Sequence, residues 1–215
     1  MRKGVHKSID FRLYLVTDRS QGGERGLLNT IEEALRGGVG AVQLREKGLS
    51  GRELLDLAHK VRHITSLFNA KLFINDRVDV AIAVGADGVH LGESALRPGD
   101  VTSKWETLLV GSSTHSLESA KRAEMEGACF VTFGPVFFTP SKARYGKPQG
   151  IGNLKKVSEE VIIPVFAIGG VKPGHVREVM NRGNAFGVAL ISGIMGAANP
   201  REATTTYLQI IEGRD

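Results

Sequence analysis

The sequence has a single cysteine, few aromatic residues and no long apolar run. One cysteine, Cys129, excludes an intramolecular disulfide framework and a cysteine-rich zinc site. No apolar stretch approaches the roughly 20 residues that a membrane-spanning helix needs. Residues 1–10 are polar and basic, and no apolar segment follows them, so we expect no secretory signal. These absences predict a cytoplasmic protein that has no contact with a membrane.

Positive charge is in excess, but it is not concentrated in one stretch. Lysine and arginine number 28 against 23 aspartate and glutamate residues, which gives a net charge of +5. A basic run and an RNA-binding aromatic motif are both missing, and aromatic residues make up only 6%. We therefore expect no nucleic acid partner. The excess charge instead indicates a solvated surface with a few cations that bind a small phosphate ligand.

A repeated unit organises the chain: a short apolar run, a small loop and a helical pattern. Helical spacing of apolar residues is clear in residues 51–68, 116–126 and 175–182. Near-continuous apolar runs are typical of parallel strands that are covered on both faces. The apolar runs are residues 12–18, 41–46, 71–76, 88–92, 108–114, 129–136, 164–170 and 186–192.

Eight such units in 215 residues predict an α/β protein with a (βα)8 TIM-barrel fold. The rival fold is an open doubly wound sheet, which normally carries the spacing GxGxxG after its first strand. The loop after residue 18 reads RSQGGE and lacks that spacing. No change of composition divides the chain, so we expect one domain over residues 1–215, with residues 1–10 as a flexible extension.

Polar residues at the carboxyl ends of barrel strands face the ligand cleft. Alternation along residues 41–47 points Gln43, Arg45 and Lys47 the same way, and two cations with an amide suit a diphosphate. A solvated cluster around Glu46 is an equal alternative. The next strand ends in Asn75-Asp76, where a carboxylate can bind Mg²⁺ beside a phosphate. A helix cap is the favoured alternative there.

The later strand ends carry hydroxyls, a lysine and glycines. Ser113 is placed to donate to a phosphate oxygen, whereas His115 suits either proton transfer or a structural hydrogen bond. Thr139, Ser141 and Lys142 suit a phosphate, and a solvated loop is the alternative. The glycine pair 169–170 and the turn after residue 190 favour a backbone phosphate site over tight turns without a ligand.

Six segments occur in order and at barrel spacing: LYLVTD, QLREK, FINDRVDVAIAVGADGVHLG, GPVFFTPSK, PVFAIGG and ISGIMGA. In this combination the chain resembles the thiamine-phosphate synthase (thiamine-phosphate pyrophosphorylase) family, which includes the TenI-type relatives. The resemblance extends from Leu13 to about Ile211.

The resemblance implies a role for each residue that matches a family motif. The family joins hydroxymethylpyrimidine diphosphate to hydroxyethylthiazole phosphate in thiamine biosynthesis, with Mg²⁺ as cofactor and pyrophosphate as second product. Asp76 would bind the Mg²⁺. The implied substrate-binding residues are Gln43, Arg45, Lys47, Asn75, Ser113, Thr139, Ser141, Lys142, Gly170, Ile191 and Ser192. The implied catalytic residues are Arg45, Lys47, Ser113 and Lys142.

One position departs from the family pattern. The family usually reads HLGQxD, with the aspartate as a second Mg²⁺ ligand, but Ala95 stands at that place here and Glu93 is the candidate replacement. TenI-type proteins also tend to lack this aspartate. Two other functions therefore stay open: a thiazole tautomerase, with His115 as the proton-transfer candidate, and a barrel that binds thiazole phosphate or thiamine phosphate without catalysis. Against the tautomerase, Pro135 stands where its best-defined members have histidine. Whether the chain forms a homo-oligomer also stays open.

Overall fold

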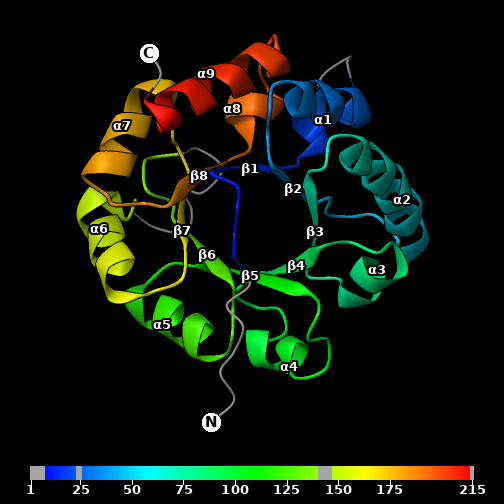
Figure 1. Cartoon of the computed structure of the whole chain (residues 1–215), viewed down its shortest axis with the longest axis horizontal. Coiled ribbons are helices and arrows are strands. Elements are labelled where there is room, and N and C mark those ends of the chain that lie inside the picture. The colour runs from blue at the N-terminus through cyan, green and yellow to red at the C-terminus, as the bar shows by residue number, and fades with distance from the viewer. Residues whose placement is uncertain (1–7, 23–25, 140–146, 214–215) are drawn as a thin grey trace.

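The structure is a computed structural model, and it describes residues 8–22, 26–139 and 147–213. Its strands form a closed barrel in which each strand pairs with the next in parallel and the last pairs with the first (Figure 1). This arrangement confirms the predicted (βα)8 fold. The strands are β1 (Leu13–Val16), β2 (Ala41–Leu44), β3 (Lys71–Asn75), β4 (Gly88–Leu91), β5 (Leu109–Thr114), β6 (Phe130–Phe133), β7 (Val165–Ile168) and β8 (Gly187–Leu190).

Helices surround the barrel (Figure 1). The start of the second helix is fixed by a capping box, in which the Glu53 amide donates to Ser50 Oγ and the Ser50 amide donates to the Glu53 carboxylate. None of the described helices is long and apolar enough to cross a bilayer. The helices are α1 (Leu27–Arg36), α2 (Gly51–Leu67), α3 (Val78–Ala83), α4 (Pro98–Thr102), α5 (Leu117–Met125), α6 (Gly150–Glu160), α7 (Pro173–Asn181), α8 (Ser192–Met195) and α9 (Pro200–Glu212), with a 3-10 turn η1 (Arg19–Gln21).

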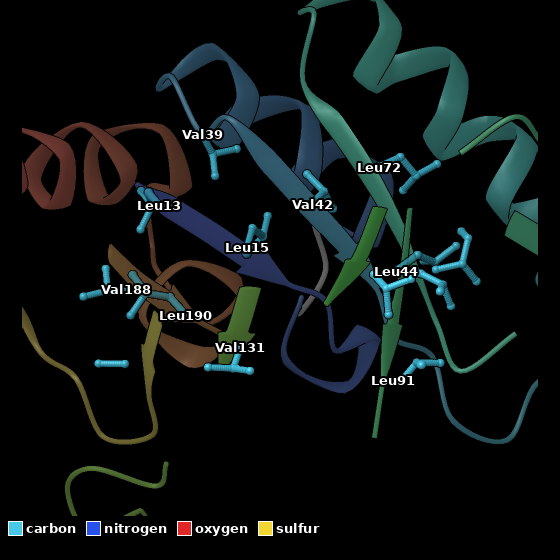
Figure 2. Packing of buried hydrophobic residues seen from close by; sticks show 14 of the residues in the cluster. Leu13, Leu15, Val39, Val42, Leu44, Leu72, Leu91, Val131, Val188 and Leu190 are labelled. Atoms are coloured by element: carbon cyan, nitrogen blue, oxygen red, sulfur yellow. The ribbon is translucent and has the colours of Figure 1, made fainter. Parts of the chain in front are cut away.

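The larger hydrophobic cluster lies between the barrel wall and the helices (Figure 2). Leu13 and Leu15 of β1 share this cluster with Ile31 and Leu35 of α1. Alternate residues of the strands therefore face the helices, and the residues between them face the barrel axis. Because both faces are covered, most strands are buried along their whole length, as the apolar runs predict.

The barrel interior is filled by a second, aromatic cluster. Phe130 lies at its centre, and its ring centroid is 5.3 to 5.7 Å from the rings of four aromatic neighbours. Glycine on a neighbouring strand makes room for three of these rings, since an added Cβ would come within 2.7 Å of a ring carbon. The pairs are Gly88 with Phe73, Gly111 with Phe130, and Gly187 with Phe166.

The chain that precedes β1 closes the amino-terminal end of this cluster. Phe11 is 4% exposed and its ring lies 5.2 Å from that of Phe166, and Ile9 is 8% exposed in the same cluster. The sequence predicts a flexible extension over residues 1–10. Ile9 is instead packed, because its apolar side chain fills the end of the barrel. Residues 1–7 of that extension lie outside the described residues.

Candidate active site

The barrel interior changes from aromatic to polar toward the carboxyl ends of the strands. Asn75 pairs in register with His90, and Ser113 pairs with Thr132. The predicted strand-end residues that the structure describes therefore follow the strands of one rim, because all the strands are parallel and close on themselves. This rim is the candidate active site.

The residues at the end of β2 differ in burial, and only Gln43 lies within the strand itself. Gln43 lies inside the barrel, 3% exposed, and its amide nitrogen has no hydrogen-bond partner among the described residues. Arg45 and Lys47 follow the strand, which ends at Leu44, so strand alternation no longer governs them. Arg45 is half-buried whereas Lys47 is exposed. The structure thus places an amide inside the barrel and two cations in the loop above it.

Arg45 lies at the mouth, and no described residue is a partner of its side chain. Its side chain has no hydrogen bond or ion pair with any residue that the structure describes. Its charge nevertheless reaches two neighbours. Burial raises the pKa of Asp18, but hydrogen bonds from Ser20 and Gln21 and the charge of Arg45 outweigh it and lower that pKa. Burial first, and then Arg45, lower the pKa of His90 to about 3, so His90 is neutral.

Glu46 links the ends of β1 and β2 through hydrogen bonds. The sequence alone does not predict this structural role. Thr17 Oγ1 donates to Glu46 Oε1 at 2.5 Å, and the Arg19 amide donates to Oε2 at 3.1 Å. The Arg45 amide donates in turn to Thr17 Oγ1 at 2.9 Å. Glu46 therefore belongs to a buried junction that sets the backbone of Arg45, rather than to a solvated charge cluster.

Asp76 is held at the rim and does not cap a helix. Helix α3 begins at Val78 with Arg77 as its N-cap residue, and that cap has no side-chain hydrogen bond. Asp76 Oδ1 accepts from the Gly92 amide at 2.7 Å, and Oδ2 accepts from Asn75 Nδ2 at 2.8 Å. Its φ of 58° turns the chain sharply after β3. The helix-cap alternative is therefore wrong, and the exposed carboxylate is free to take a ligand.

The rim offers a metal ion one fixed carboxylate. Each oxygen of Asp76 accepts one hydrogen bond and keeps a lone pair free. No group of three or more histidine, cysteine, aspartate or glutamate residues that could hold a metal occurs in the described ranges. Mg²⁺ is commonly held by one or two protein carboxylates together with substrate phosphates and water. The donor set fits an ion that is completed by a diphosphate, and it does not fit a preformed all-protein site.

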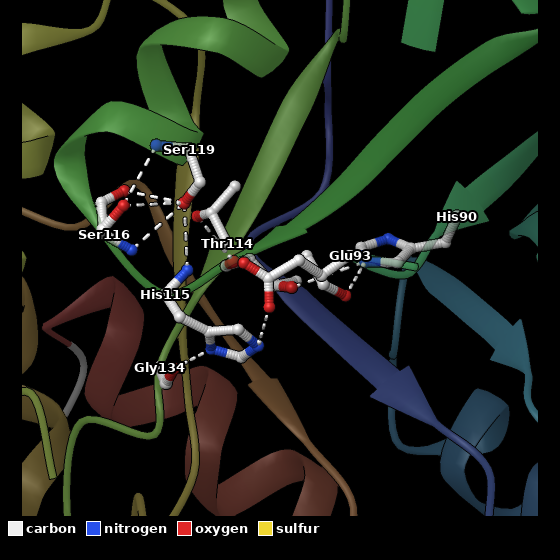
Figure 3. A network of polar contacts seen from close by, with 9 residues as sticks. His90, Glu93, Thr114, His115, Ser116, Ser119 and Gly134 are labelled. Carbon is white, nitrogen blue, oxygen red and sulfur yellow. Dashed lines mark hydrogen bonds and ion pairs between the residues drawn. The ribbon is translucent and has the colours of Figure 1, made fainter. Parts of the chain in front are cut away.

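Glu93 lies near His115 (Figure 3). Its carboxylate lies 4.0 Å from His115 Nε2, while His115 Nδ1 donates to the Gly134 carbonyl. That carbonyl contact favours the structural role for His115. Ala95 closes a turn, with its amide donating to the Gly92 carbonyl at 3.0 Å. Glu93 as a second metal ligand stays a prediction.

The loops after β6 and β7 pack tightly on each other. The amides of Val136 and Phe137 donate to the carbonyls of Ile168 and Gly169 at 2.9 and 3.0 Å. Gly170 has a φ of +68°, and an added Cβ would lie 2.6 Å from the Phe138 carbonyl oxygen. This close approach explains why glycine follows β7, and it brings the candidate phosphate turn beside the loop that leads to Thr139.

The remaining candidates divide into described and undescribed residues. Thr139 is half-buried, Ile191 is the half-buried N-cap residue of α8, and Ser192 is the exposed first residue of that helix. Ser141 and Lys142 lie outside the described residues. Their phosphate-binding roles stay predictions from the sequence.

These features define a (βα)8-barrel protein with a polar carboxyl rim as its candidate ligand site. A family model described as thiamine monophosphate synthase matches residues 13–194. This chain belongs to that family.

Individual relatives match over nearly the whole chain. A Geobacter sulfurreducens protein named "Putative thiamine-phosphate synthase" is 50% identical over 208 residues, which cover 96% of this chain and 97% of that protein. The thiamine-phosphate synthase of Clostridium novyi is 38% identical, over 94% of this chain and 99% of that protein. The solved thiamine phosphate pyrophosphorylase of Pyrococcus furiosus matches with a TM-score of 0.86 at 38% identity, over 95% and 96% of the two chains.

Proposed function

We propose that this chain is a transferase that joins hydroxymethylpyrimidine diphosphate to hydroxyethylthiazole phosphate. The products are thiamine phosphate and pyrophosphate. One observation carries the proposal: Arg45, a half-buried cation with no partner among the described residues, lies on the same rim as Asp76 and Ser113. A cation, a carboxylate and a hydroxyl in one cleft suit a diphosphate. Family membership supports the identity of the two substrates.

The reaction needs charge stabilisation more than it needs a strong base. The bond between the pyrimidine methylene carbon and the diphosphate oxygen breaks, and the electron pair leaves with the diphosphate. The aminopyrimidine supports the methylene cation, which the thiazole nitrogen then attacks. Arg45 and Lys47 offset the growing negative charge on the leaving group, with Ser113 as a hydrogen-bond donor. Gly170, Ile191 and Ser192 hold the thiazole phosphate and so orient the attacking ring.

Magnesium would be held by Asp76, with Asn75 fixing the carboxylate. A bound Mg²⁺ supplies further positive charge to the leaving diphosphate. The protein would contribute the oriented carboxylate of Asp76, and the diphosphate would contribute further anionic ligands.

The first test supplies both substrates and Mg²⁺ to the purified chain. We expect thiamine phosphate and pyrophosphate in equal amounts, measured by chromatography and by ³¹P NMR. Removal of Mg²⁺ with EDTA should stop the reaction, and adding Mg²⁺ back should restore it. Proton exchange on carboxythiazole phosphate without metal, in the absence of any thiamine phosphate, would favour the tautomerase instead. Ligand binding with neither reaction would favour the non-catalytic barrel.

Ala95→Asp should strengthen Mg²⁺ binding if Asp76 is the single carboxylate ligand. A second carboxylate in the β4–α4 loop adds both a ligand and a charge. We expect the Mg²⁺ concentration for half-maximal activity to fall about tenfold. Calorimetry with Mg²⁺ alone gives a second readout. The matched control is Ser94→Asp, which adds the same charge one residue earlier. Equal effects of the two substitutions would contradict a specific metal site at position 95.

A further inference from the structure

A buried tyrosine of the last helix contacts the turns that follow β7 and β8. We propose that Tyr207 is a positioning residue: its hydroxyl binds the Val171 carbonyl and it packs against Gly193, and these contacts hold the two turns at the spacing that the thiazole phosphate needs. Tyr207 is 3% exposed and belongs to the cluster between the barrel wall and the helices, so it acts through the turns. The choice of ligand rests on the proposed function, whereas the contact between the turns does not.

Tyr207 lies on α9, which packs against both α7 and α8 (Figure 1). Its Oη donates to the Val171 carbonyl oxygen at 3.1 Å. A Cβ added to Gly193 would lie 2.8 Å from the same Oη and 3.3 Å from the ring carbon Cζ. Glycine at position 193 therefore makes room for the tyrosine. One buried hydroxyl thus contacts both the turn after β7 and the residues that follow β8.

The direction of this hydrogen bond is fixed, because a carbonyl oxygen only accepts and the phenol carries one proton. Tyr207 has no second hydrogen-bond partner among the described residues. A buried hydroxyl that lost its acceptor would destabilise the folded state. The Val171 carbonyl is therefore tied to α9 in the folded protein.

The turn after β7 binds protein groups through its carbonyls and leaves amides for a ligand. The Gly169 carbonyl accepts from the Phe137 amide at 3.0 Å, and the Val171 carbonyl accepts from Tyr207 at 3.1 Å. The amides of Gly170 and Val171 have no acceptor within residues 8–22, 26–139 and 147–213. Backbone amides held in fixed directions suit the oxygens of a phosphate. Tyr207 thus helps to fix the backbone that carries two candidate donors.

The sheet does not set the distance between the two turns. The pairing of β7 with β8 ends at Ile168 and Ala189, so both turns lie beyond the ladder. Ser192 directly precedes Gly193, which packs against Tyr207. A phosphate that binds both turns loses affinity when their spacing fluctuates, because part of the binding free energy then goes into ordering the turns. The contact through Tyr207 orders them before the ligand binds.

Tyr207→Phe keeps the buried ring and removes only the hydroxyl. We expect KM for hydroxyethylthiazole phosphate to rise about fivefold, while kcat and KM for the pyrimidine diphosphate stay within about twofold of the wild type. Calorimetry with hydroxyethylthiazole phosphate alone should show the same loss of affinity. The matched control is Thr204→Val, which removes another buried hydroxyl of α9 that donates to the Pro200 carbonyl at 2.8 Å. An unchanged affinity in Tyr207→Phe would overturn the proposal, as would equal losses in both variants.

Gly193→Ala tests the contact from the other turn. Its Cβ would meet the Tyr207 hydroxyl at 2.8 Å, so we expect the affinity for hydroxyethylthiazole phosphate to fall about tenfold. Tyr207→Phe removes the oxygen that this Cβ meets, and the next atom is 3.3 Å away. The double variant should therefore bind the thiazole phosphate more tightly than Gly193→Ala alone does. Losses that simply add would mean that the two turns are not coupled through Tyr207.

The outcomes separate this proposal from the proposed function. If the wild type makes thiamine phosphate and Tyr207→Phe binds as the wild type does, the positioning role is wrong and the function stands. If the folded wild type neither binds hydroxyethylthiazole phosphate nor makes thiamine phosphate, the proposed function and the choice of ligand are both wrong. Amide ¹H–¹⁵N spectra then decide whether Tyr207 links the turns: Tyr207→Phe should shift the signals of Lys172 and Gly193, and unchanged signals would refute the contact. Thermal melts check that each variant is folded.

Discussion

Replacing Arg45 by glutamine is expected to lower kcat/KM for thiamine phosphate formation about 100-fold. Arg45 is half-buried at the rim, and its side chain has no hydrogen bond or ion pair with a described residue. Its charge is therefore available to a ligand, and its stabilising effect in the structure is limited to the smallest of the causes that lower the pKa of Asp18. The free energy of unfolding should change by less than about 0.5 kcal/mol. Steady-state kinetics and urea unfolding measure the two effects separately.

Two further variants test whether the effect of Arg45→Gln is specific to the guanidinium at this position. Arg45→Lys keeps the charge but loses the planar fork of the guanidinium, so we expect an intermediate loss of about tenfold. Arg36→Gln removes an exposed arginine of α1 that pairs with Glu32 at 2.6 Å, and it should leave the rate unchanged. If Arg45→Gln lowers the rate no more than Arg36→Gln does, Arg45 takes no part in binding the diphosphate.

The barrel and its rim could be predicted because the rule that places them is simple. Near-continuous apolar runs alternate with helical patterns, and parallel strands bring their ends to one side. The position of Ser113 follows from that rule alone. Strand alternation does not predict where side chains point beyond the last residue of a strand. Alternation predicts the face of Gln43 within β2, but it does not govern Arg45 and Lys47, because β2 ends at Leu44 and Gly48 turns the chain with a φ of +84°.

The burial of individual polar residues is harder to predict from one sequence than the barrel fold is. Glu46 lies in a segment with cations on both sides, so an exposed ion pair is its simplest interpretation. Its partner Thr17 is 29 residues away, and only the pairing of β1 with β2 brings the two together. The sequence gives only a weak indication that His90 faces the barrel interior: in the strand GVHL, alternation places it on the same face as Gly88. Its contacts with Tyr14 and Ser113 depend on three strands and have no local signature.

The aromatic interior supports the polar rim above it, and Phe130→Ala is expected to damage both. Phe130 is fully buried, and its ring lies 5.3 Å from that of Phe73, 5.4 Å from that of Phe166 and 5.6 Å from that of His90. Truncating a buried phenylalanine costs about 3–5 kcal/mol, because apolar surface is lost and a cavity remains. For a domain of this length, that corresponds to a fall in Tm of roughly 6–20 °C.

A larger apolar side chain at position 130 should recover part of the lost stability. The same truncation at an exposed phenylalanine should cost almost no stability. Phe130→Leu retains much of the buried volume, so we expect it to cost less than half as much as Phe130→Ala. Phe138→Ala removes a ring that is 68% exposed and should change the free energy of unfolding by less than about 0.5 kcal/mol. Thermal and urea unfolding measure all three variants. A Phe130→Ala protein as stable as Phe138→Ala would mean that the interior rings do not hold the barrel together. In that case His90 would also lack the packing that keeps its ring between β1 and β5.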